Sequence, residues 1–299
     1  MIKYLVHNNI DFAKYDQCIY ESKNSLIYGY SWYLNCVAPG WDILILNNYE
    51  AVMPLPKRKK YGINYIFQPA WVQQLGIFSR HQLKEDLIAE FINSIPRKFK
   101  LVDILFNFDN HFSSKYLSKK DNFILNLSDS YESLFEGYNK LRKRSVKKAK
   151  KLNLIIKEVD NSKPIINLFK KNKGIELNNI NSDYELLNQL IQEGFKRQKV
   201  EVFCVKNKNQ NLLGGVIFLK NKNRIIYLFS AVNQEGKESQ VITFIIDFVI
   251  KKYSNADMIL DFEGSMITGV AKFFESFGAV KETYFWYKRK RIIRLPESL

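Results

Sequence analysis

The chain has 299 residues, 46% of them hydrophobic and 14% aromatic, which is enough for a substantial core in one large or two ordinary domains. Its formal net charge of +16 favours anionic partners such as RNA, nucleotides or phosphorylated substrates. A genome rich in lysine codons would raise this charge without any selection for binding, so clustering is more informative than the total. The cations cluster at 57–60, 140–151 and 287–294.

The sequence argues against a membrane protein, a secreted protein and a metal- or disulfide-stabilised protein. The sequence has no run of about 18 apolar residues, the minimum for a membrane-spanning helix, and its start, "MIKYLVHNN", lacks the regions of a signal peptide. We therefore expect a cytoplasmic protein. The three cysteines and three histidines do not have the spacing of metal ligands, so we expect neither a metal nor a disulfide framework.

The first third of the chain has the pattern of a mixed α/β unit. Its expected elements are a helix at 25–38, strands at 42–47 and 49–56, an extended stretch at 63–79, a helix at 82–95 and a strand at 100–108. The polar stretch 110–122 is predicted to be a loop or the seam between two units.

The second unit begins with a helix signal, because Asp129 followed by Glu132 has the spacing of a capping box. The same helix is predicted to continue through 140–151, where eight of twelve residues are Lys or Arg. Residues that recur every three or four positions would form a narrow stripe that packs against the rest of the protein, and the cations would lie on the solvent-exposed faces. Its members are Tyr138, Leu141, Ser145, Ala149 and Leu152. Like charges this dense weaken a helix, so we expect an anionic group nearby.

Helix and strand patterns alternate downstream. The expected elements are strands at 152–159, 200–207, 212–221, 224–232 and 256–264, helices at 163–177, 182–198, 240–253 and 265–278, and terminal strands after 279. Both halves have the same coarse α/β composition. We therefore predict two related domains, 1–125 and 126–299, each a mixed sheet flanked by helices.

The order of elements in the second half is similar to the GNAT acyltransferase fold. Two stretches make the resemblance more specific: "YNKLRKRSVKKAKKLNLIIKEV" (138–159) and "LDFEGSMITGVAKFFESFGA" (260–279) resemble segments of the second domain of FemABX-like proteins. The resemblance implies two tandem GNAT-like domains over nearly the whole chain. It also implies a soluble enzyme that moves an acyl or aminoacyl group from acyl-CoA or aminoacyl-tRNA to an amine, without a tightly bound cofactor, in a cleft between the halves.

The sequence departs from the family at three points. Cys36 or a neighbour in "WYLNCV" stands where the bridge-building members have a lysine, so a muropeptide acceptor is not indicated. Residues 160–200 are too few for the helical arm of tRNA-dependent members. The turn "NQEGKESQ" keeps one glycine, Gly236, of the coenzyme A pattern and adds Lys237. An inactive GNAT-like protein that binds RNA or another polyanion is therefore the alternative, and the acceptor and oligomeric state are not predicted.

Transfer to an amine needs a base and donors for the oxyanion, but no covalent nucleophile. Asp261 and Glu263 are the candidate bases, because residues two apart at a strand end project to the same face. Helix capping by Asp261 and pairing of Glu263 with a lysine are the structural alternatives. Tyr227 and Ser230 have hydroxyls for an acyl carbonyl, although tyrosine in an apolar strand is more often part of a core.

The remaining site candidates fall into three groups. Gly264 and Ser265 would start the last helix and offer amides to an oxyanion, or Ser265 would only cap that helix. The second group consists of cations that would bind the phosphates of the donor. The alternative is that they are only solvated at the surface. They are Arg142, Arg144, Lys147, Lys148 and Lys237. The third group would line the acceptor pocket and comes from the stretch "QPAWVQQLG". An extended strand at the edge of a sheet could have the same mixture of residues. The group consists of Gln68, Trp71, Gln73 and Gln74.

Overall fold

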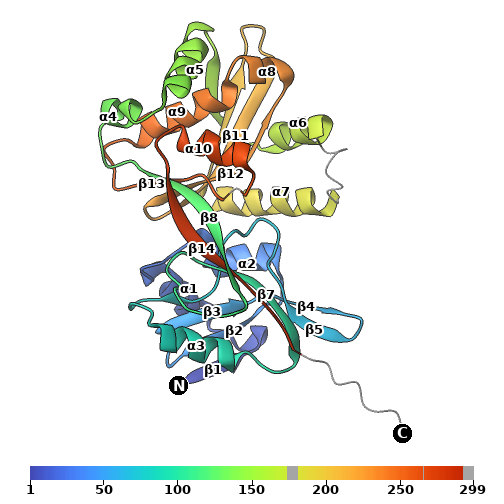
Figure 1. Cartoon of the computed structure of the whole chain (residues 1–299). Helices are drawn as coiled ribbons and strands as arrows, with labels where there is room; N and C mark the ends of the chain where they lie inside the picture. Colours follow the sequence, from blue (N-terminus) through green and yellow to red (C-terminus); the bar gives the residue numbers. More distant parts are fainter. Residues whose placement is uncertain (174–180, 265, 292–299) are drawn as a thin grey trace. The chain divides into compact units, whose positions relative to one another are not determined.

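The computed structural model describes residues 1–173, 181–264 and 266–291 and has a mixed α/β fold with helices flanking its sheets (Figure 1). The chain divides into two compact units: unit 1 comprises Met1–Lys120 with Thr283–Leu299, and unit 2 comprises Asp121–Glu282. The chain passes between them within β8 (Leu117–Asn126) and β14 (Val280–Lys290). The candidate Ser265 and the end of the third basic cluster, 292–294, lie outside the described residues.

The domain boundary at 125 and 126 stays a prediction. The compact units instead separate between Lys120 and Asp121, and unit 1 also includes most of β14, from Thr283 onward. The expected α/β class is confirmed, since both units combine sheets with flanking helices. No helix within the described ranges is both long enough and apolar enough to cross a membrane.

Unit 1 contains two groups of strands, in the orders β1-β2-β3-β6 and β4-β5-β7-β14. Its other strands are β1 (Ile2–Leu5), β2 (Asp42–Leu46), β3 (Ala51–Leu55), β4 (Lys57–Lys60), β5 (Ile63–Ile66), β6 (Phe78–Ser79) and β7 (Phe99–Phe106). Its helices are α1 (Phe12–Glu21), α2 (Ser31–Val37) and α3 (Glu85–Ser94), with short 3-10 turns at His7–Asn9 and Ile27–Gly29. The helix expected at 25–38 is thus interrupted near Tyr30, which N-caps α2 in an extended conformation.

Unit 2 contains the strand order β8-β13-β12-β11-β10-β9. Its strands are β9 (Ile155–Val159), β10 (Val200–Lys206), β11 (Leu212–Asn221), β12 (Arg224–Val232) and β13 (Ile259–Asp261), together with β8. Its helices are α4 (Tyr131–Glu136), α5 (Lys140–Lys151), α6 (Lys163–Lys173), α7 (Asn181–Lys196), α8 (Gln234–Glu238), α9 (Val241–Tyr253) and α10 (Thr268–Glu275). The pairing of β12 with β13 is parallel, and the other pairings of β9 to β13 are antiparallel.

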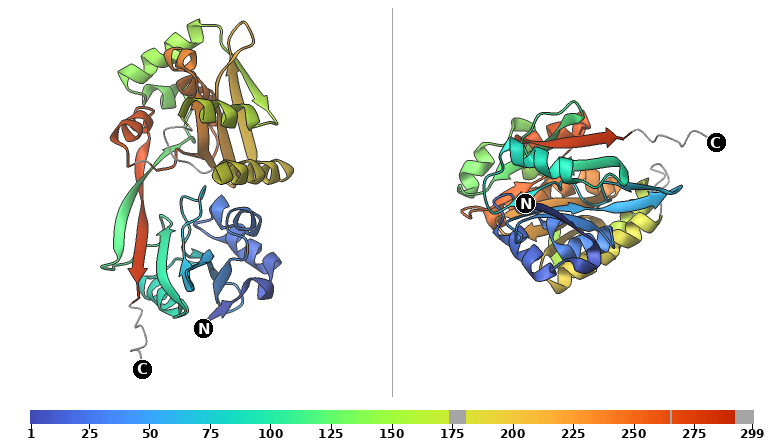
Figure 2. Two further views of the ribbon diagram at one scale, coloured as in Figure 1. Left: turned by 90° about the vertical axis from the view of Figure 1, so that its right-hand side faces the viewer. Right: turned by 90° about the horizontal axis from the view of Figure 1, so that it is seen from below.

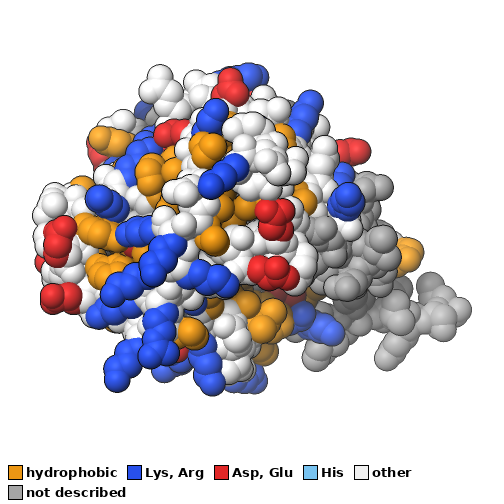
Figure 3. Space-filling model, turned by 90° about the horizontal axis from the view of Figure 1, so that it is seen from above, with side chains coloured by type: hydrophobic (Ala, Val, Ile, Leu, Met, Phe, Trp, Pro, Cys, Tyr) orange, Lys and Arg blue, Asp and Glu red, His pale blue; other side chains and the backbone are white. Residues whose placement is uncertain are grey.

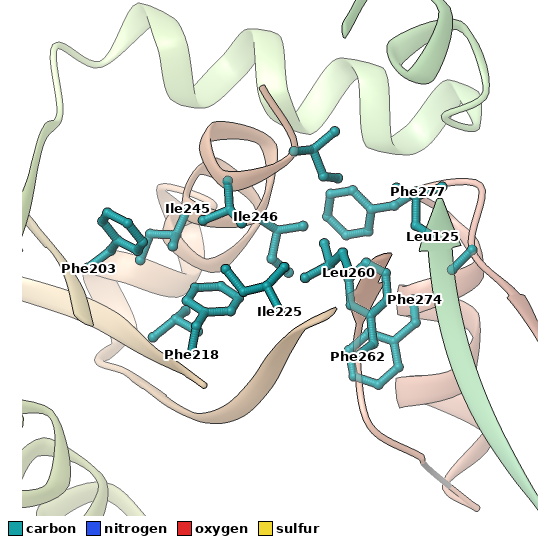
Figure 4. Packing of buried hydrophobic residues seen from close by; sticks show 14 of the residues in the cluster. Leu125, Phe203, Phe218, Ile225, Ile245, Ile246, Leu260, Phe262, Phe274 and Phe277 are labelled. Atoms are coloured by element: carbon teal, nitrogen blue, oxygen red, sulfur yellow. The ribbon is translucent and has the colours of Figure 1, made fainter. Parts of the chain in front are cut away.

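Helices cover both faces of the unit 2 sheet (Figure 2). On β11, a Cβ added to Gly215 would lie 2.5 Å from Ile165 of α6, whereas its neighbour Val216 belongs to the core cluster on the α9 side. Neighbouring residues of a strand project to opposite faces. Helix α6 therefore packs on the opposite face from α9. Figure 4 shows the α9 side of the core, where Ile245 lies beside the ring of Phe203 and the rings of Phe262 and Phe274 lie beyond Leu260.

The single helix predicted through the cationic stretch is wrong. Ser130 caps the start of α4, and this helix ends at Glu136 with Gly137 as its C-cap. Asn139 then caps a second helix, α5, by accepting a hydrogen bond from the amide of Arg142.

The predicted stripe is partly correct, because Tyr138 and Ala149 are buried as expected. Leu141 and Leu152 are instead 66% and 42% exposed, and α5 buries Arg142 and Val146. An arginine has a long aliphatic stem that can be buried like an apolar side chain, and the hydrophobic pattern does not reveal this.

Candidate functional site

In unit 2, two neighbouring parallel strands diverge. β12 pairs with β13 from Arg224 to Ile226, β13 ends at Asp261 opposite Ile226, and β12 continues to Val232. The register between β11 and β12 shifts beyond Tyr227, so that Leu228 is an extra residue in β12. A bulge of this kind bends a strand and redirects its side chains. The end of β12 therefore leads away from β13 and into α8 and α9.

Tyr227 and Ser230 lie on this diverging part of β12. The Tyr227 hydroxyl donates a hydrogen bond to Ser230 Oγ, and both side chains are only partly exposed. The Tyr227 ring contacts Phe218 and Phe274, on the α9 side of the sheet. Burial raises the pKa of Tyr227 to about 12, despite the opposing effect of the Ser230 hydrogen bond. At neutral pH the group is therefore a protonated hydroxyl, suited to donate a hydrogen bond or a proton.

Asp261 lies on the other face of the sheet from Tyr227. Its neighbours Leu260 and Phe262 belong to the core cluster that Tyr227 touches, so the alternation of the strand directs Asp261 away from it. The Asp261 carboxylate is fully buried and accepts a hydrogen bond from Arg224 at 2.7 Å. Arg224 also binds Glu282, at 2.9 Å. Burial raises the pKa of Asp261, although Arg224 opposes the shift. The structure does not bring Asp261 and Tyr227 together.

Glu263 follows β13 in a left-handed backbone conformation, with φ of 58°. Its amide donates a hydrogen bond to Asp261 Oδ1 at 2.9 Å, which helps to hold this turn. A non-glycine residue in this region carries a strain of about 1–2 kcal/mol, and strain of this kind is frequent at functional sites. Both Glu263 and Gly264 are partly exposed. Ser265, which we predicted to follow them at the oxyanion site, lies outside the described residues.

The turn that corresponds to the coenzyme A pattern is a closed helical turn, α8. The side chain of Asn233 accepts a hydrogen bond from the amide of Gly236, and its carbonyl accepts one from Lys237. Gly236 is a glycine for packing reasons, because an added Cβ would collide with Leu213 O of β11. The exposed Lys237 side chain remains accessible, but these amides are already bonded. No side chain caps the first turn of α9, which follows.

Arg142 lies beside that first turn of α9. Its Nη1 donates a hydrogen bond to Thr243 Oγ1, and its Nε donates one to Ser276 Oγ at 2.9 Å. The guanidinium stacks at 4.3 Å from the ring of Phe273. It is 6% exposed and forms no ion pair within the described part of the chain, and burial lowers its pKa to about 10. The group is thus a desolvated cation for which an anion would be a favourable partner.

A hollow of about 510 Å³ opens between α5 and α10 at this arginine. Leu141 of α5 and the preceding N-cap, Asn139, line it on one side, and Lys272 and Glu275 of α10 line it on the other. Thr243 and Ser276, which hold Arg142, were not identified by sequence reasoning. The only available signal was that each is a polar residue within an apolar helical segment.

The other predicted phosphate-binding cations of α5 are in a different environment. Arg144, Lys147 and Lys148 are exposed and form no ion pair with any described residue. Figure 3 looks onto the end of unit 2 that carries α5 and shows Lys and Arg side chains gathered next to hydrophobic ones. These three cations therefore form a solvated surface, separate in character from the buried Arg142.

Two of the four residues predicted to line the acceptor pocket in unit 1 form hydrogen bonds that stabilise the loop they belong to. Gln74 is fully buried and accepts a hydrogen bond from the amide of Phe108 at 3.0 Å. Gln68 binds the amide of Leu105 at 2.9 Å. Gln73 accepts a hydrogen bond from Gln74, and Trp71 has a φ of 62°. The two buried or bonded glutamines thus connect the loop to the end of β7, whereas Trp71 and Gln73 are partly exposed.

Comparison with solved structures matches this fold over nearly the whole chain. The crystal structure of FemX matches with a TM-score of 0.68 and 12% identity, covering 95% of this chain and 96% of that one. L-PGS from Bacillus licheniformis matches with a TM-score of 0.54 and 10% identity, covering 95% and 93%. N-myristoyltransferase of Saccharomyces cerevisiae with bound myristoyl-CoA matches with a TM-score of 0.50 and 10% identity, covering 97% and 80%.

The chain has the tandem GNAT fold. The predicted resemblance to FemABX-like proteins is therefore confirmed at the level of the fold. No protein-family model and no curated protein matches the sequence.

Proposed function

We propose that this protein transfers an acyl or aminoacyl group from an activated donor to an amine. The proposal is carried by one observation: the hydroxyl pair of Tyr227 and Ser230 lies where β12 diverges from β13, directly before the α8 and α9 segment. The tandem GNAT fold supports it, because neighbours with this fold include an N-myristoyltransferase with bound myristoyl-CoA. Beyond Ile226 the backbone of β12 is no longer paired with β13, so its edge on that side could bind an extended acyl donor.

In the proposed step, the lone pair of the amine attacks the acyl carbonyl, and the bond from this carbon to the donor's sulfur or oxygen breaks. Glu263 takes the proton that the amine loses, and Tyr227 gives its proton to the leaving thiolate or alkoxide. The raised pKa of Tyr227 keeps this proton on the hydroxyl at neutral pH. Asp261 is not needed, because its carboxylate serves Arg224 on the other face.

Donor phosphates are proposed to bind at the start of α9. Arg142 supplies a buried guanidinium, and Lys237 an exposed ammonium at the preceding turn. An uncapped helix N-terminus favours anions because its free amides and dipole point toward them. Arg144, Lys147 and Lys148 would add only long-range attraction. The acceptor contacts of Trp71 and Gln73 remain predictions.

The donor anchor is tested by thermal shift with coenzyme A and with ADP. At about 100 times its Kd, a ligand that binds only the folded protein is expected to raise the Tm by about 5 °C or more. Arg142→Met should abolish this shift, because it removes the buried cation. The matched control Arg144→Met, on the exposed side of the same helix, should retain it. Equal shifts in both variants would reject Arg142 as the anchor.

Turnover is tested by measuring product from acetyl-CoA and from total aminoacyl-tRNA with a panel of amines. Tyr227→Phe should lower kcat/KM by about 100- to 10,000-fold, the usual contribution of a positioned acid or base. Tyr253→Phe is the matched control, since Tyr253 donates its hydroxyl hydrogen bond to Glu201 elsewhere in unit 2. Comparable activity of Tyr227→Phe and the wild type would reject the role of Tyr227.

The second candidate function is binding of a polyanion without turnover. It is favoured by the closed α8 turn, whose amides are already bonded, and by the exposed cations of α5. Absence of product with every donor, together with salt-sensitive RNA binding that Lys147→Gln/Lys148→Gln removes, would favour this function over transfer.

A further inference from the structure

A second basic surface lies in unit 1 and shares no residue with the set assigned to transfer. It is a hollow of about 350 Å³, a volume at the lower end of that of ligand sites. Four strands or their ends contribute to it. The lining residues are Lys60, Tyr61, Ile63, Tyr65, Lys100, Leu101, Lys290 and Arg291.

The sheet brings together two of the basic clusters that are far apart in the sequence, 57–60 and 287–291. β4 pairs with β5, β5 pairs with β7, and β7 pairs with β14. Arg58 is the partner of Tyr65, Tyr65 of Leu101, and Leu101 of Lys290, so these four side chains form one row across the sheet. The row has a cation at each end and apolar or aromatic groups between them.

The positive charge of this hollow, which we call the β4–β14 groove, is not compensated. Four of its lining residues are cations, none is acidic, and none of the four forms an ion pair with a described residue. The guanidinium of Arg291 is held by hydrogen bonds to the carbonyls of Pro96 and Ile95, at 3.0 and 3.1 Å. Burial, then the nearby Arg289 and Arg97, lower the pKa of Arg291.

The floor and edge of the groove are apolar and aromatic. Leu101 and Tyr65 are partly buried, whereas Ile63 is 38% and Tyr61 90% exposed. A tyrosine ring exposed to this extent, next to Lys60 at 5.3 Å, has a free face for stacking. Aromatic side chains between cations are the usual components of surfaces that bind unpaired bases, because every base has a π-face and each nucleotide carries a phosphate.

We propose that the β4–β14 groove binds a single-stranded polynucleotide. Tyr61 and Tyr65 stack with bases, and the cations on either side bind the flanking phosphates. The two tyrosines between cations favour this partner over an anionic bilayer, which offers phosphates but no planar group on which the rings could stack. A duplex has its bases already stacked and offers no free base to the tyrosines.

The test uses fluorescence anisotropy of a labelled eight-nucleotide oligouridine with the 299-residue chain at several salt concentrations. A duplex of the same length and vesicles of phosphatidylglycerol and phosphatidylcholine serve as the competing ligands. The variants are Tyr61→Ala and the pair Lys60→Gln/Lys290→Gln. The matched control is Lys157→Gln/Lys251→Gln, which removes the same charge from two exposed lysines of unit 2 that belong to no site proposed above.

We expect the oligouridine to bind more tightly than the duplex. Tyr61→Ala should weaken it about 5- to 100-fold, corresponding to about 1–3 kcal/mol per stacked base. Lys60→Gln/Lys290→Gln should reduce the slope of log K against log salt by about 1.4, since each phosphate contact to a single strand contributes about 0.7. The Lys157→Gln/Lys251→Gln control should change neither quantity appreciably.

Three results would overturn the proposal: no oligouridine binding, equal losses in the groove variants and the control variant, or a groove-dependent affinity for vesicles in place of oligouridine. This proposal and the transfer reaction fail independently. Tyr227→Phe removes the hydroxyl required for transfer and should leave oligouridine binding unchanged, because Tyr227 belongs to unit 2 and the groove to unit 1.

Discussion

Replacing Arg224 with methionine is expected to lower the free energy of unfolding by about 3–5 kcal/mol, the usual cost of removing one partner from a buried ion pair. Arg224 is 4% exposed and binds both Asp261, at 2.7 Å, and Glu282, at 2.9 Å. Without the guanidinium, the fully buried carboxylate of Asp261 loses its cation and cannot reach water. Urea denaturation, followed by the fluorescence of the four tryptophans and by circular dichroism, measures the loss.

The pH dependence of this loss distinguishes an uncompensated charge from a packing defect. Burial already holds the pKa of Asp261 above its usual value, and removing Arg224 removes the largest opposing effect. Because the folded protein then binds a proton more tightly than the unfolded chain, stability falls as the pH rises through the folded pKa. The deficit of Arg224→Met should therefore shrink from pH 8 to pH 5.

Two further variants serve as controls for Arg224. The double variant Arg224→Met/Asp261→Asn should recover part of the stability, since no charge remains at residue 261. Lys281→Met, which breaks an exposed pair with Asp121, should have little effect. A deficit that is equal at both pH values and unchanged in the double variant would contradict the proposed cause.

The second large effect is expected for Gly76→Ala in unit 1, which should lower the free energy of unfolding by about 2–5 kcal/mol. Gly76 has a φ of 87°, a region in which an L side chain is strained. An added Cβ would also collide with Asn110 Oδ1 and lie 2.6 Å from Phe106 Cδ1. Strain of about 1–2 kcal/mol and overpacking of about 1–3 kcal/mol act together here. The side chain of Asn110 cannot move freely, because it accepts a hydrogen bond from Ile77 at 2.7 Å.

Gly40→Ala separates the two contributions. Gly40 has a similar φ of 78°, but an added Cβ would meet nothing within 4 Å. It should therefore cost only the strain of about 1–2 kcal/mol. Urea denaturation of both variants gives the steric contribution as the difference between them. Equal losses would show that the close approach at Gly76 relaxes without cost.

Most elements of this fold are predictable from local patterns. The apolar runs of β10 to β12 and the helical patterns of α7 and α9 depend on neighbours within a few residues, so the sequence indicated these elements correctly. Short-range breaks were harder to identify. Asn139 begins a new helix after Gly137, yet the cationic stretch looked continuous because a polar cap resembles any other polar surface residue.

The environment of the candidate residues was much less predictable. Arg142 was expected on an outer face with the other cations, but the rings of Phe273 and Phe277 bury it. Asp261 and Tyr227 were expected at one site, but the alternation of β12 and β13 directs them to opposite faces. Partners far along the chain decide burial and facing, and local composition carries no information about them.

By itself, the amino-acid sequence determined the α/β class, most of the helices and strands, the excess of cations and the resemblance to FemABX-like proteins. These properties follow from periodicity, which depends on residues close together in the sequence, and from composition, which is a sum over the whole chain. Only the tertiary structure decided which cation is buried, which carboxylate is paired, and that the clusters at 57–60 and 287–291 share one groove. Strand pairing across more than two hundred residues produces that groove, and such pairing is set by the packing of the whole unit.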